Sequence, residues 1–545
     1  MLSDRAAARQ SPFLSAPLDE QHPDFLALDA ELPDDHPARL LSHLVGLLDL
    51  GPLTASYAGR GSLAFPPHLL LAFVFLMEER GDLSPAEWAR IARRDDEAKW
   101  LLRGLRPSRS LLYHFRDRLQ PFLPGFHRQI LHDAIAEGFC QPEQASLDGT
   151  FIPSFASRHR LVTAATVARR LNELWWCAWI RDGLTWIADS EEDDDVRVQA
   201  LVLWLTIVFG LIAAGAVDEL MLGELPAWMA QSAAGRLRQG QRYADTLQRL
   251  QEDREDYERR QRQQAKARRV PAERRAACLT DPEAALGRDK YGLFRPLYDT
   301  LLLNSLEGEW VLHYDVQARA TDQGTLPGML QQAREKVGIT VKEVAVDDGF
   351  VNLLDLKACK EQGVVVYAPV EDDVKPKAEE KLPKQAFRWD TQEQTYYCPQ
   401  GHRLEVRTRT TATRQQGERV ELPVVIYGCA KEHCLACPER ERCTKTPQRG
   451  REVKRFEGEE IMDELRERMK QPSSQELYKH RGHSAERNNA EMKEHRGLRV
   501  FRSYGQKRAQ AQVGLTVVVM NGLRLQRRRW ERDNKPPAEA RHRVA

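Results

Sequence analysis

Residues 341–368 read VKEVAVDDGFVNLLDLKACKEQGVVVYA, and this stretch decides the fold class. The β-branched run at 341–346 predicts a strand, which ends at the turn Asp347-Asp348-Gly349. Residues 351–362 predict a helix, and residues 364–368 predict the next strand. A strand, a helix and a second strand in direct succession indicate an α/β protein.

The chain before this unit supplies the rest of the predicted sheet. Strands are predicted at residues 143–155, 293–303 and 310–318, and a helix at residues 326–337. We expect Asp148-Gly149 to interrupt the first strand and Pro153 to end it. The sequence therefore predicts an α/β core over residues 143–370, broken once by a long insertion at residues 157–278.

Composition places the chain among multidomain globular proteins. Its 545 residues are 42% hydrophobic, which excludes a disordered chain, a collagen-like fibre and a disulfide-rich miniprotein. With 81 Lys and Arg against 80 Asp and Glu, the net charge of +1 excludes a uniformly basic coat. The first 18 residues hold no apolar run of the signal-peptide kind, so we expect a cytoplasmic protein.

Residues 35–125 are expected to form a helical N-terminal domain. Ser108 can cap a helix whose apolar face carries Leu112, Phe115 and Leu119. The other face of this helix presents Arg109 and Arg116. Such a basic helix suits a helix-turn-helix contact with DNA, and it equally suits a plain packing or dimerisation domain.

The insertion at 157–278 is first apolar and then highly charged. Residues 241–275 are dense in Gln, Arg and Glu and predict a long solvated helix or coiled coil, or else a partly disordered spacer. Residues 200–217 are uncharged and just reach the length of a membrane-spanning helix. Their flanks are acidic and lack a Lys/Arg cluster, so we favour a buried core helix or an oligomer contact, and no membrane association.

A cysteine-rich insertion at residues 386–450 follows a Lys-, Glu- and Pro-rich linker. Cys434, Cys437 and Cys443, with Cys398 upstream in an expected hairpin, have spacings that suit tetrahedral Zn²⁺. Further candidate ligands in the same segment are Cys429, His402 and His433. Four protein ligands would leave no place for a catalytic water, so the predicted zinc is structural.

Three acidic residues lie in settings that suit catalysis. Asp148 is in the first strand, Asp347 is at the end of a strand, and Glu486 is in a late helix. The carboxyl ends of sheet strands face the crevice where α/β proteins bind ligands. Three carboxylates can hold two Mg²⁺ ions, and such a pair of ions promotes phosphoryl transfer on nucleic-acid backbones.

The surroundings of Glu486 add groups that bind phosphate. Lys493 lies seven residues further on, which places both residues on one helix face. Tyr478 and Arg481 can supply a stacking surface and a bidentate phosphate clamp. The alternative is an exposed helix with ordinary pairs of opposite charge.

The spacing Tyr478-x2-Arg481-x4-Glu486-x6-Lys493 resembles the Tyr-Arg-Glu-Lys signature of DDE transposases encoded by bacterial insertion sequences. Two further motifs of that family match Asp148-Gly149-Thr150 and Asp347-Asp348-Gly349-Phe350. The resemblance extends to the N-terminal domain, through His36-Pro37, the run 66–71 and residues 115–119, and to the cysteine segment. About residues 157–275 stay unmatched.

This resemblance implies an RNase H-like catalytic core, completed by C-terminal helices at residues 451–533. It implies that Asp148, Asp347 and Glu486 are the catalytic acids and hold Mg²⁺ or Mn²⁺. The implied partners are the inverted-repeat ends of the element and target DNA, and we expect a homodimer or higher oligomer because two ends must be joined. An alternative is a descendant that binds DNA as a regulator and has lost catalysis, although all three acids are present.

Overall fold

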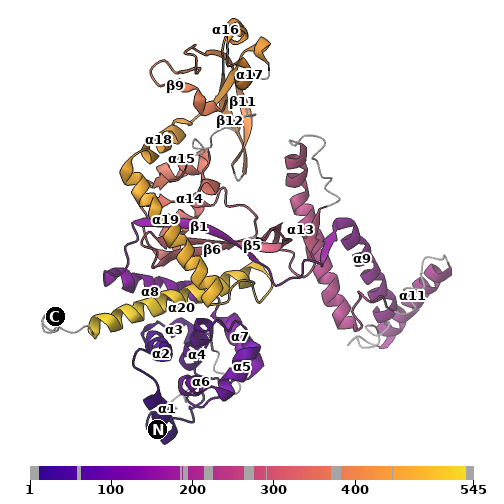
Figure 1. The fold of residues 1–545 in the computed structure, drawn as a ribbon. Helices are drawn as coiled ribbons and strands as arrows, with labels where there is room; N and C mark the ends of the chain where they lie inside the picture. The colour runs from indigo at the N-terminus through magenta and orange to yellow at the C-terminus, as the bar shows by residue number, and fades with distance from the viewer. Residues whose placement is uncertain are drawn as a thin grey trace, which may run out of the picture.

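The computed structural model describes residues 12–57, 63–183, 187, 194–213, 225–262, 275–289, 291–369, 382–416, 418–444 and 446–534. Figure 1 shows an α/β body at the centre and an N-terminal group of helices at one end of it. The helical insertion and the cysteine-rich segment project from the α/β body in different directions.

A six-stranded sheet forms the centre of the α/β body. Its strands are β1 (Gln144–Pro153), β4 (Ala285–Arg288), β5 (Phe294–Ser305), β6 (Val311–Gln317), β7 (Glu343–Ala345) and β8 (Val365–Tyr367). The order is β4-β5-β1-β7-β8, and β6 pairs with β5 as well. β5 runs antiparallel to β1, β4 and β6, whereas β1, β7 and β8 are parallel.

The elements between residues 326 and 368 follow the sequence pattern closely. α14 (Leu326–Gln332) continues into the π-turn η4 (Ala333–Val337), and α15 (Leu353–Glu361) connects β7 to β8. The prediction of an α/β protein is therefore confirmed, with a mixed rather than an all-parallel sheet.

The predicted interruption of the first strand is wrong. β1 continues through Asp148 and Gly149, which pair with Leu302 and Leu301 of β5. A long antiparallel partner supplies hydrogen bonds along the whole strand, and this outweighs the weak strand propensity of Asp and Gly. Because Gly149 has no side chain, the side chains of Asp299 and Asp322 can lie close to the backbone of β1.

The N-terminal helices pack into one apolar core with the sheet. They are α1 (Pro23–Glu31), α2 (Pro37–Leu47), α3 (Gly51–Ala55), α4 (Pro67–Glu79), α5 (Pro85–Arg94), α6 (Asp96–Leu102), α7 (Arg109–Leu119) and α8 (Leu123–Ala136). The Ser108 hydroxyl caps α7 as predicted, and Leu112, Phe115 and Leu119 are buried. The C-terminal helix α20 (Gln506–Asp533) lies between these helices and the sheet (Figure 1) and contacts α2, α4, α8 and β6.

One buried acid lies where α4 meets α20. Glu78 is 3% exposed, and its carboxylate accepts a hydrogen bond from the Thr516 hydroxyl. Burial raises the pKa of Glu78 to about 7, although the Thr516 hydrogen bond and the Arg496 guanidinium oppose the rise. The charged form is therefore less favourable in the folded protein than in the unfolded chain.

We predict that this group makes the protein less stable at high pH. Because the folded pKa exceeds the unfolded value of 4.5, stability is greatest below that value and falls as the pH rises to about 7. Replacing Glu78 by Gln should remove this pH dependence and raise the free energy of unfolding at about pH 8 by roughly 2–4 kcal/mol. Urea unfolding over a pH series measures both effects. Glu31→Gln, at an exposed position, is the control, and equal pH profiles for native and Glu78→Gln would refute the prediction.

The insertion consists mainly of helices on a small two-stranded base. β2 (Leu161–Thr163) pairs with β3 (Ala276–Cys278), and α9 (Ala164–Cys177) packs against α13 (Ala233–Arg262) around buried Tyr243. The long charged helix is confirmed up to residue 262, and residues 263–274 lie outside the described residues.

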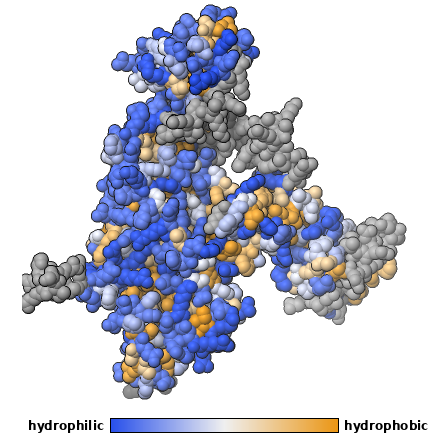
Figure 2. Space-filling model, viewed as in Figure 1, coloured by the Kyte–Doolittle hydropathy of each residue, from blue (hydrophilic) through white to orange (hydrophobic). Residues whose placement is uncertain are grey.

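The apolar run at 200–217 lies largely in α11 (Asp194–Ala213), and its end lies outside the described residues. The predicted burial of this helix in the core is wrong for the described part, since Leu203 is 62% and Phe209 65% exposed. Figure 2 shows orange, hydrophobic surface on the insertion. No helix in the described ranges is long and apolar enough to cross a membrane.

The cysteine-rich segment contains its own small sheets. They consist of β9 (Arg388–Asp390) with β10 (Thr395–Tyr397), and of β11 (Glu405–Gln416), β12 (Glu418–Gly428) and β13 (Glu452–Phe456). Two short helices, α16 (Lys431–Ala436) and α17 (Arg440–Cys443), lie between β12 and β13. The chain then returns to the α/β body through α18 (Glu460–Met469), α19 (Pro472–Ala490) and the π-turn η9 (Glu491–His495).

Candidate active site

Strand register places Asp148 and Asp347 side by side. In the parallel pairing of β1 with β7, Ser146 lies opposite Ala345. Asp148 and Asp347 each follow two residues later, so they lie at the same level on the same face of the sheet. Two acids that are 199 residues apart in the chain thus meet just beyond the point where the parallel pairing of β1 with β7 ends.

Arg481 of α19 joins these two acids. One terminal guanidinium nitrogen, Nη2, lies 2.7 Å from Asp148 Oδ1 and 3.2 Å from Asp347 Oδ2. The Arg481 side chain is 17% exposed and the Asp148 side chain 20%, so water screens these contacts only partly. The structure therefore brings together three of the residues predicted from sequence.

The same helix supplies further contacts. Asn489 donates a hydrogen bond of 2.7 Å to Asp148 Oδ2, and Lys493, in η9, donates to the Thr150 hydroxyl. Tyr478 is half-buried, and burial raises its pKa, although nearby Arg481 opposes the rise. Asn489 was not predicted from the sequence, because a helical asparagine carries no distinctive pattern.

Asp148 is strained electrostatically despite its cationic neighbour. Burial raises the pKa of Asp148 to about 6; Arg481 and Lys493 lower it, whereas Asp347 and Asp322 raise it further. Like charges close together in a partly dry site are costly unless a cation lies among them. Because burial is the main cause of the rise, the charged form of Asp148 is less favourable here than in water.

Glu486 lies on the exposed side of α19. It is three residues before Asn489, which contacts Asp148, but its own side chain is exposed. Among the hydrogen bonds and ion pairs of the described residues, none joins Glu486 to Asp148 or Asp347. Its predicted role therefore stays a prediction.

Two acids that the sequence did not single out also lie here. A Cβ built on Gly149 would be 2.4 Å from Asp322 Oδ1 and 3.2 Å from Asp299 Oδ1. Burial raises the pKa of Asp299, and the neighbouring Asp322 raises it further. Asp299 is part of β5, and Asp322 is in the loop before α14. Four aspartates therefore gather around Asp148 and Gly149, at the middle of β1.

In the described part of the chain, no group of three or more His, Cys, Asp or Glu side chains is arranged to hold a metal ion. At the acidic site this agrees with the position of Arg481, whose guanidinium lies between two of the carboxylates. The buried Asp347 Oδ1 nevertheless has no hydrogen-bond partner.

The cysteines predicted to bind zinc gather in one small core. Cys429, Cys434 and Cys443 are buried there, Cys398 packs against them, and Cys437 is half-buried nearby. Burial raises the pKa of Cys429 to about 12, and Cys434, Cys398 and Cys443 raise it further. The rings of His402 and His433 stack with centroids 4.0 Å apart. The thiols are thus neighbours, but in the described residues they are not arranged with the geometry of a metal site.

Arg109 and Arg116, the two further residues predicted to contact DNA, lie on α7 in the N-terminal group of helices. Both guanidinium groups lie over the Tyr113 ring, at 5.6 and 5.3 Å from its centroid. Arg116 also pairs with Asp117 at 2.8 Å and its side chain is 14% exposed, whereas Arg109 is exposed.

A comparison with known protein families finds a match for the C-terminal part of the chain. Residues 397–526 match a family model described as a transposase DDE domain. The match includes Tyr478, Arg481, Glu486 and Lys493, and it confirms the resemblance that these residues carry. Asp148 and Asp347 lie outside the matched range. No curated protein and no solved structure matches the chain.

Proposed function

We propose that this chain, which carries a transposase DDE domain, is a DDE transposase that cleaves and rejoins DNA at the inverted-repeat ends of an insertion sequence. The observation that carries the proposal is the meeting of Asp148 and Asp347 through the register of β1 and β7. Arg481 from the matched domain joins both acids, so the matched and unmatched parts of the chain contribute to one site.

The sheet supports an RNase H-like core. Read in chain order, its first, second and third long strands are the antiparallel β1, β5 and β6, and the later β7 and β8 run parallel to β1 on the other side. In this arrangement β1 and β7 are adjacent, so that Asp148 of β1 and Asp347 after β7 can act together.

The acidic groups fit a hard divalent cation. Carboxylate oxygens are the ligands that Mg²⁺ and Mn²⁺ prefer, and the buried Asp347 Oδ1 has no other partner. We propose that Asp148, Asp347 and Glu486 hold the cations, with Arg481 moving off the carboxylates when DNA and metal bind. Bound cations would activate the attacking oxygen and stabilise the leaving oxygen of the phosphoryl transfer.

The chain's own cationic groups would hold the DNA backbone. Arg481 can donate two parallel hydrogen bonds to one phosphate, and Lys493 acts as a point charge for the next. Tyr478 offers a ring for a base or sugar beside the cleaved bond. Arg109 offers a phosphate contact on the N-terminal domain, and Arg116 would add another if it exchanged Asp117 for DNA. Two copies of the chain would be needed to join two DNA ends.

The gathered thiols support the proposal of a structural zinc in the cysteine-rich segment. Cys398, Cys434, Cys437 and Cys443 are the predicted ligands, and buried Cys429 is a fifth candidate. We expect the purified protein to contain one zinc ion per chain by elemental analysis, and Cys434→Ser to lose it. Cys278→Ser is the matched control, since the Cys278 thiol already lies against hydrogen-bonding oxygens. Zinc retained by Cys434→Ser, or absent from the native protein, would refute the zinc site.

Cleavage of DNA tests the proposed function. A labelled duplex with the element's own terminal repeat is incubated with the native chain, with Mg²⁺ or with EDTA, beside a duplex of scrambled sequence. We expect cuts at the repeat end in Mg²⁺ alone, followed by joining of the freed 3′ end to a second DNA. Tight binding without cleavage in Mg²⁺, in Mn²⁺ or on a pre-nicked end would contradict the proposal and favour a DNA-binding regulator.

A further inference from the structure

Gly149 separates two groups of carboxylates along β1. Adjacent residues of a strand point to opposite faces, so the space beside Gly149 lies across the strand from Asp148. Asp299 and Asp322 fill this space, with one oxygen of each close to the position that a Cβ of Gly149 would take. Asp322 also lies near Gly349, where a built Cβ would be 3.8 Å from Asp322 Oδ2 and 3.1 Å from Asp347 Oδ1.

The carboxyl groups on this side have few donors: Asp299 and Asp322 lie within hydrogen-bonding reach of each other, and one shared proton can join them. Asp299 is 0% exposed, and both of its oxygens are buried without a hydrogen-bond partner. Oδ1 of Asp322 and Oδ1 of Asp347 are also buried and unpartnered. The guanidinium of Arg319 lowers the pKa of Asp299 through its charge, but it donates its hydrogen bonds to Gln317 and to the carbonyl of Gln323. Unpaired buried polar groups are rare in folded proteins and ask for an explanation, such as a bound ion.

We infer that Asp299 and Asp322 hold a divalent cation beside Gly149 of β1, on the face opposite Asp148. Mg²⁺ and Mn²⁺ bind proteins through one or two carboxylates and keep several waters, so two ligands suffice and no closed cage of protein groups is needed. A shared proton would satisfy at most two of the four unpartnered oxygens, whereas a cation with its waters can satisfy all four.

This cation would hold the Asp347 side chain in place through its bound waters. Its waters could donate to Asp347 Oδ1, which leaves Oδ2 turned to the side where Arg481 now lies. The inference builds on the proposed function, because it gives the proposed catalytic acid a support. It does not depend on catalysis, because cation binding can be measured without DNA.

Mn²⁺ binding in the absence of DNA tests the site. The loss of the free Mn²⁺ signal in electron paramagnetic resonance is followed for the native full-length chain and for Asp322→Asn, Asp299→Asn and Asp148→Asn, with Asp348→Asn as the exposed control. We expect Asp322→Asn and Asp299→Asn each to weaken one Mn²⁺ site by about tenfold or more, since even outer-shell changes cost that much. Asp148→Asn and Asp348→Asn should keep this site.

Thermal unfolding gives a second reading that does not require a measurable affinity. Without divalent ions, Asp322→Asn should melt at a temperature equal to or above the native value, because like charges no longer face each other. Added Mg²⁺ should raise the melting temperature of the native protein more than that of Asp322→Asn. Native Mn²⁺ affinity and an undiminished Mg²⁺ effect in the two Asn variants would overturn the inference and indicate a proton-sharing pair. Loss of Mn²⁺ from Asp322→Asn together with failed DNA cleavage by the native chain would uphold this site and refute the proposed function alone.

Discussion

Replacing Asp347 by Asn is expected to lower the rate of Mg²⁺-dependent DNA cleavage on the order of a thousandfold, about 4 kcal/mol of activation free energy. Asparagine keeps the shape of the side chain but removes the negative charge that a cation needs. A cation at a phosphoryl-transfer site contributes several kcal/mol of charge stabilisation, so its loss should dominate the kinetics. DNA affinity should stay equal or rise, because the variant repels phosphates less.

The neighbouring Asp348 provides a matched control for this experiment. It is exposed at the start of a short 3₁₀ turn, whereas Asp347 is turned toward Arg481. Asp348→Asn should therefore cleave at nearly the native rate. Single-turnover cleavage and a gel-shift assay in EDTA separate chemistry from binding. A cleavage rate within tenfold of native for Asp347→Asn, or equal losses for both variants, would refute the assignment of Asp347.

Much of the sheet could be predicted from its local sequence. The stretch 341–368 has one strongly apolar strand on either side of an amphipathic helix, and turns separate the three elements. Buried parallel strands need such continuous apolar runs, so the pattern is strong. The position of Asp347 at the end of a strand could be predicted in this way, and the pairing of Ser146 with Ala345 places Asp148 beside it.

Asp299 and Asp322 were not predicted as site residues from the sequence. Asp299 lies within the strand Phe294–Ser305, in which all residues from Pro296 onward are buried. A single acid in such an apolar run is a sequence signal for a functional residue. Asp322 lies in a polar loop and gives no signal. Its position depends on how the loop before α14 folds back to Gly149, which is a tertiary contact.

The late helix also departs from its expected form. It begins at Pro472, well before the Tyr-Arg-Glu-Lys residues, where proline suits a first turn. It changes to a π-turn at Glu491, which alters the angle between Glu486 and Lys493 from that of a regular helix. A π-turn has no sequence signature of its own, and here it coincides with a buried cluster of charges.

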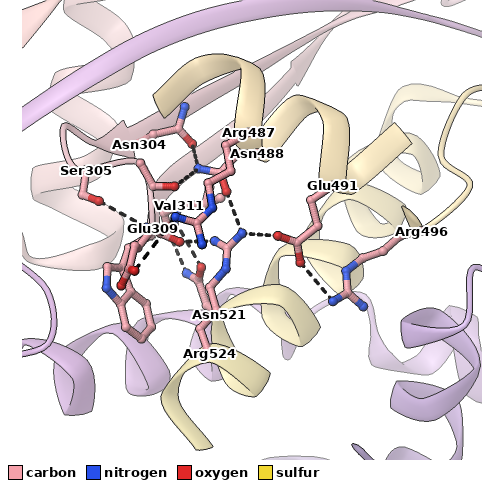
Figure 3. Close-up of polar contacts among 12 residues, drawn as sticks. Asn304, Ser305, Glu309, Val311, Arg487, Asn488, Glu491, Arg496, Asn521 and Arg524 are labelled. Carbon is pink, nitrogen blue, oxygen red and sulfur yellow. Dashed lines mark hydrogen bonds and ion pairs between the residues drawn. The ribbon is translucent and has the colours of Figure 1, made fainter. Parts of the chain in front are cut away.

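That cluster centres on Glu491 and connects three parts of the chain (Figure 3). Glu491 Oε1 lies 3.1 Å from Arg496 Nη2, and Oε2 pairs with Arg524 of α20. Arg496 also pairs with Glu79 of α4. The side chain of Arg496 is only 4% exposed and that of Arg524 only 12%, so both cations depend on these partners.

The cluster continues into the sheet. Arg524 Nη2 donates to Asn488 Oδ1 at 2.8 Å, and Asn488 donates to Asn304 of β5 at 2.9 Å. Asn521 donates to the Val311 carbonyl at 2.8 Å (Figure 3). The network therefore fixes α19, which carries Arg481, against β5 and against α20.

Replacing Glu491 by Ala is expected to lower the free energy of unfolding by about 3–5 kcal/mol, because it leaves the buried Arg524 guanidinium without its carboxylate and Arg496 with Glu79 alone. Burial alone would raise the pKa of Glu491, yet Arg524 and Arg496 hold it below its ordinary value, so the carboxylate is charged in the folded protein. The control is Glu494→Ala, since Glu494 pairs with Arg499 where both side chains are exposed. That surface pair should cost at most about 1 kcal/mol.

Urea unfolding followed by tryptophan fluorescence measures the difference between these two variants. An additional change tests the cause: Arg524→Met should recover part of the loss in the Glu491→Ala background, because it removes one of the orphaned charges, while being destabilising in the native chain. If Glu491→Ala and Glu494→Ala cost the same, or if Arg524→Met adds its full cost to Glu491→Ala, the buried charges are not what holds this junction. Recovery would instead show that the unpaired Arg524 charge accounts for part of the loss, so the junction of α19 and α20 requires the Glu491 carboxylate as the partner of a buried cation.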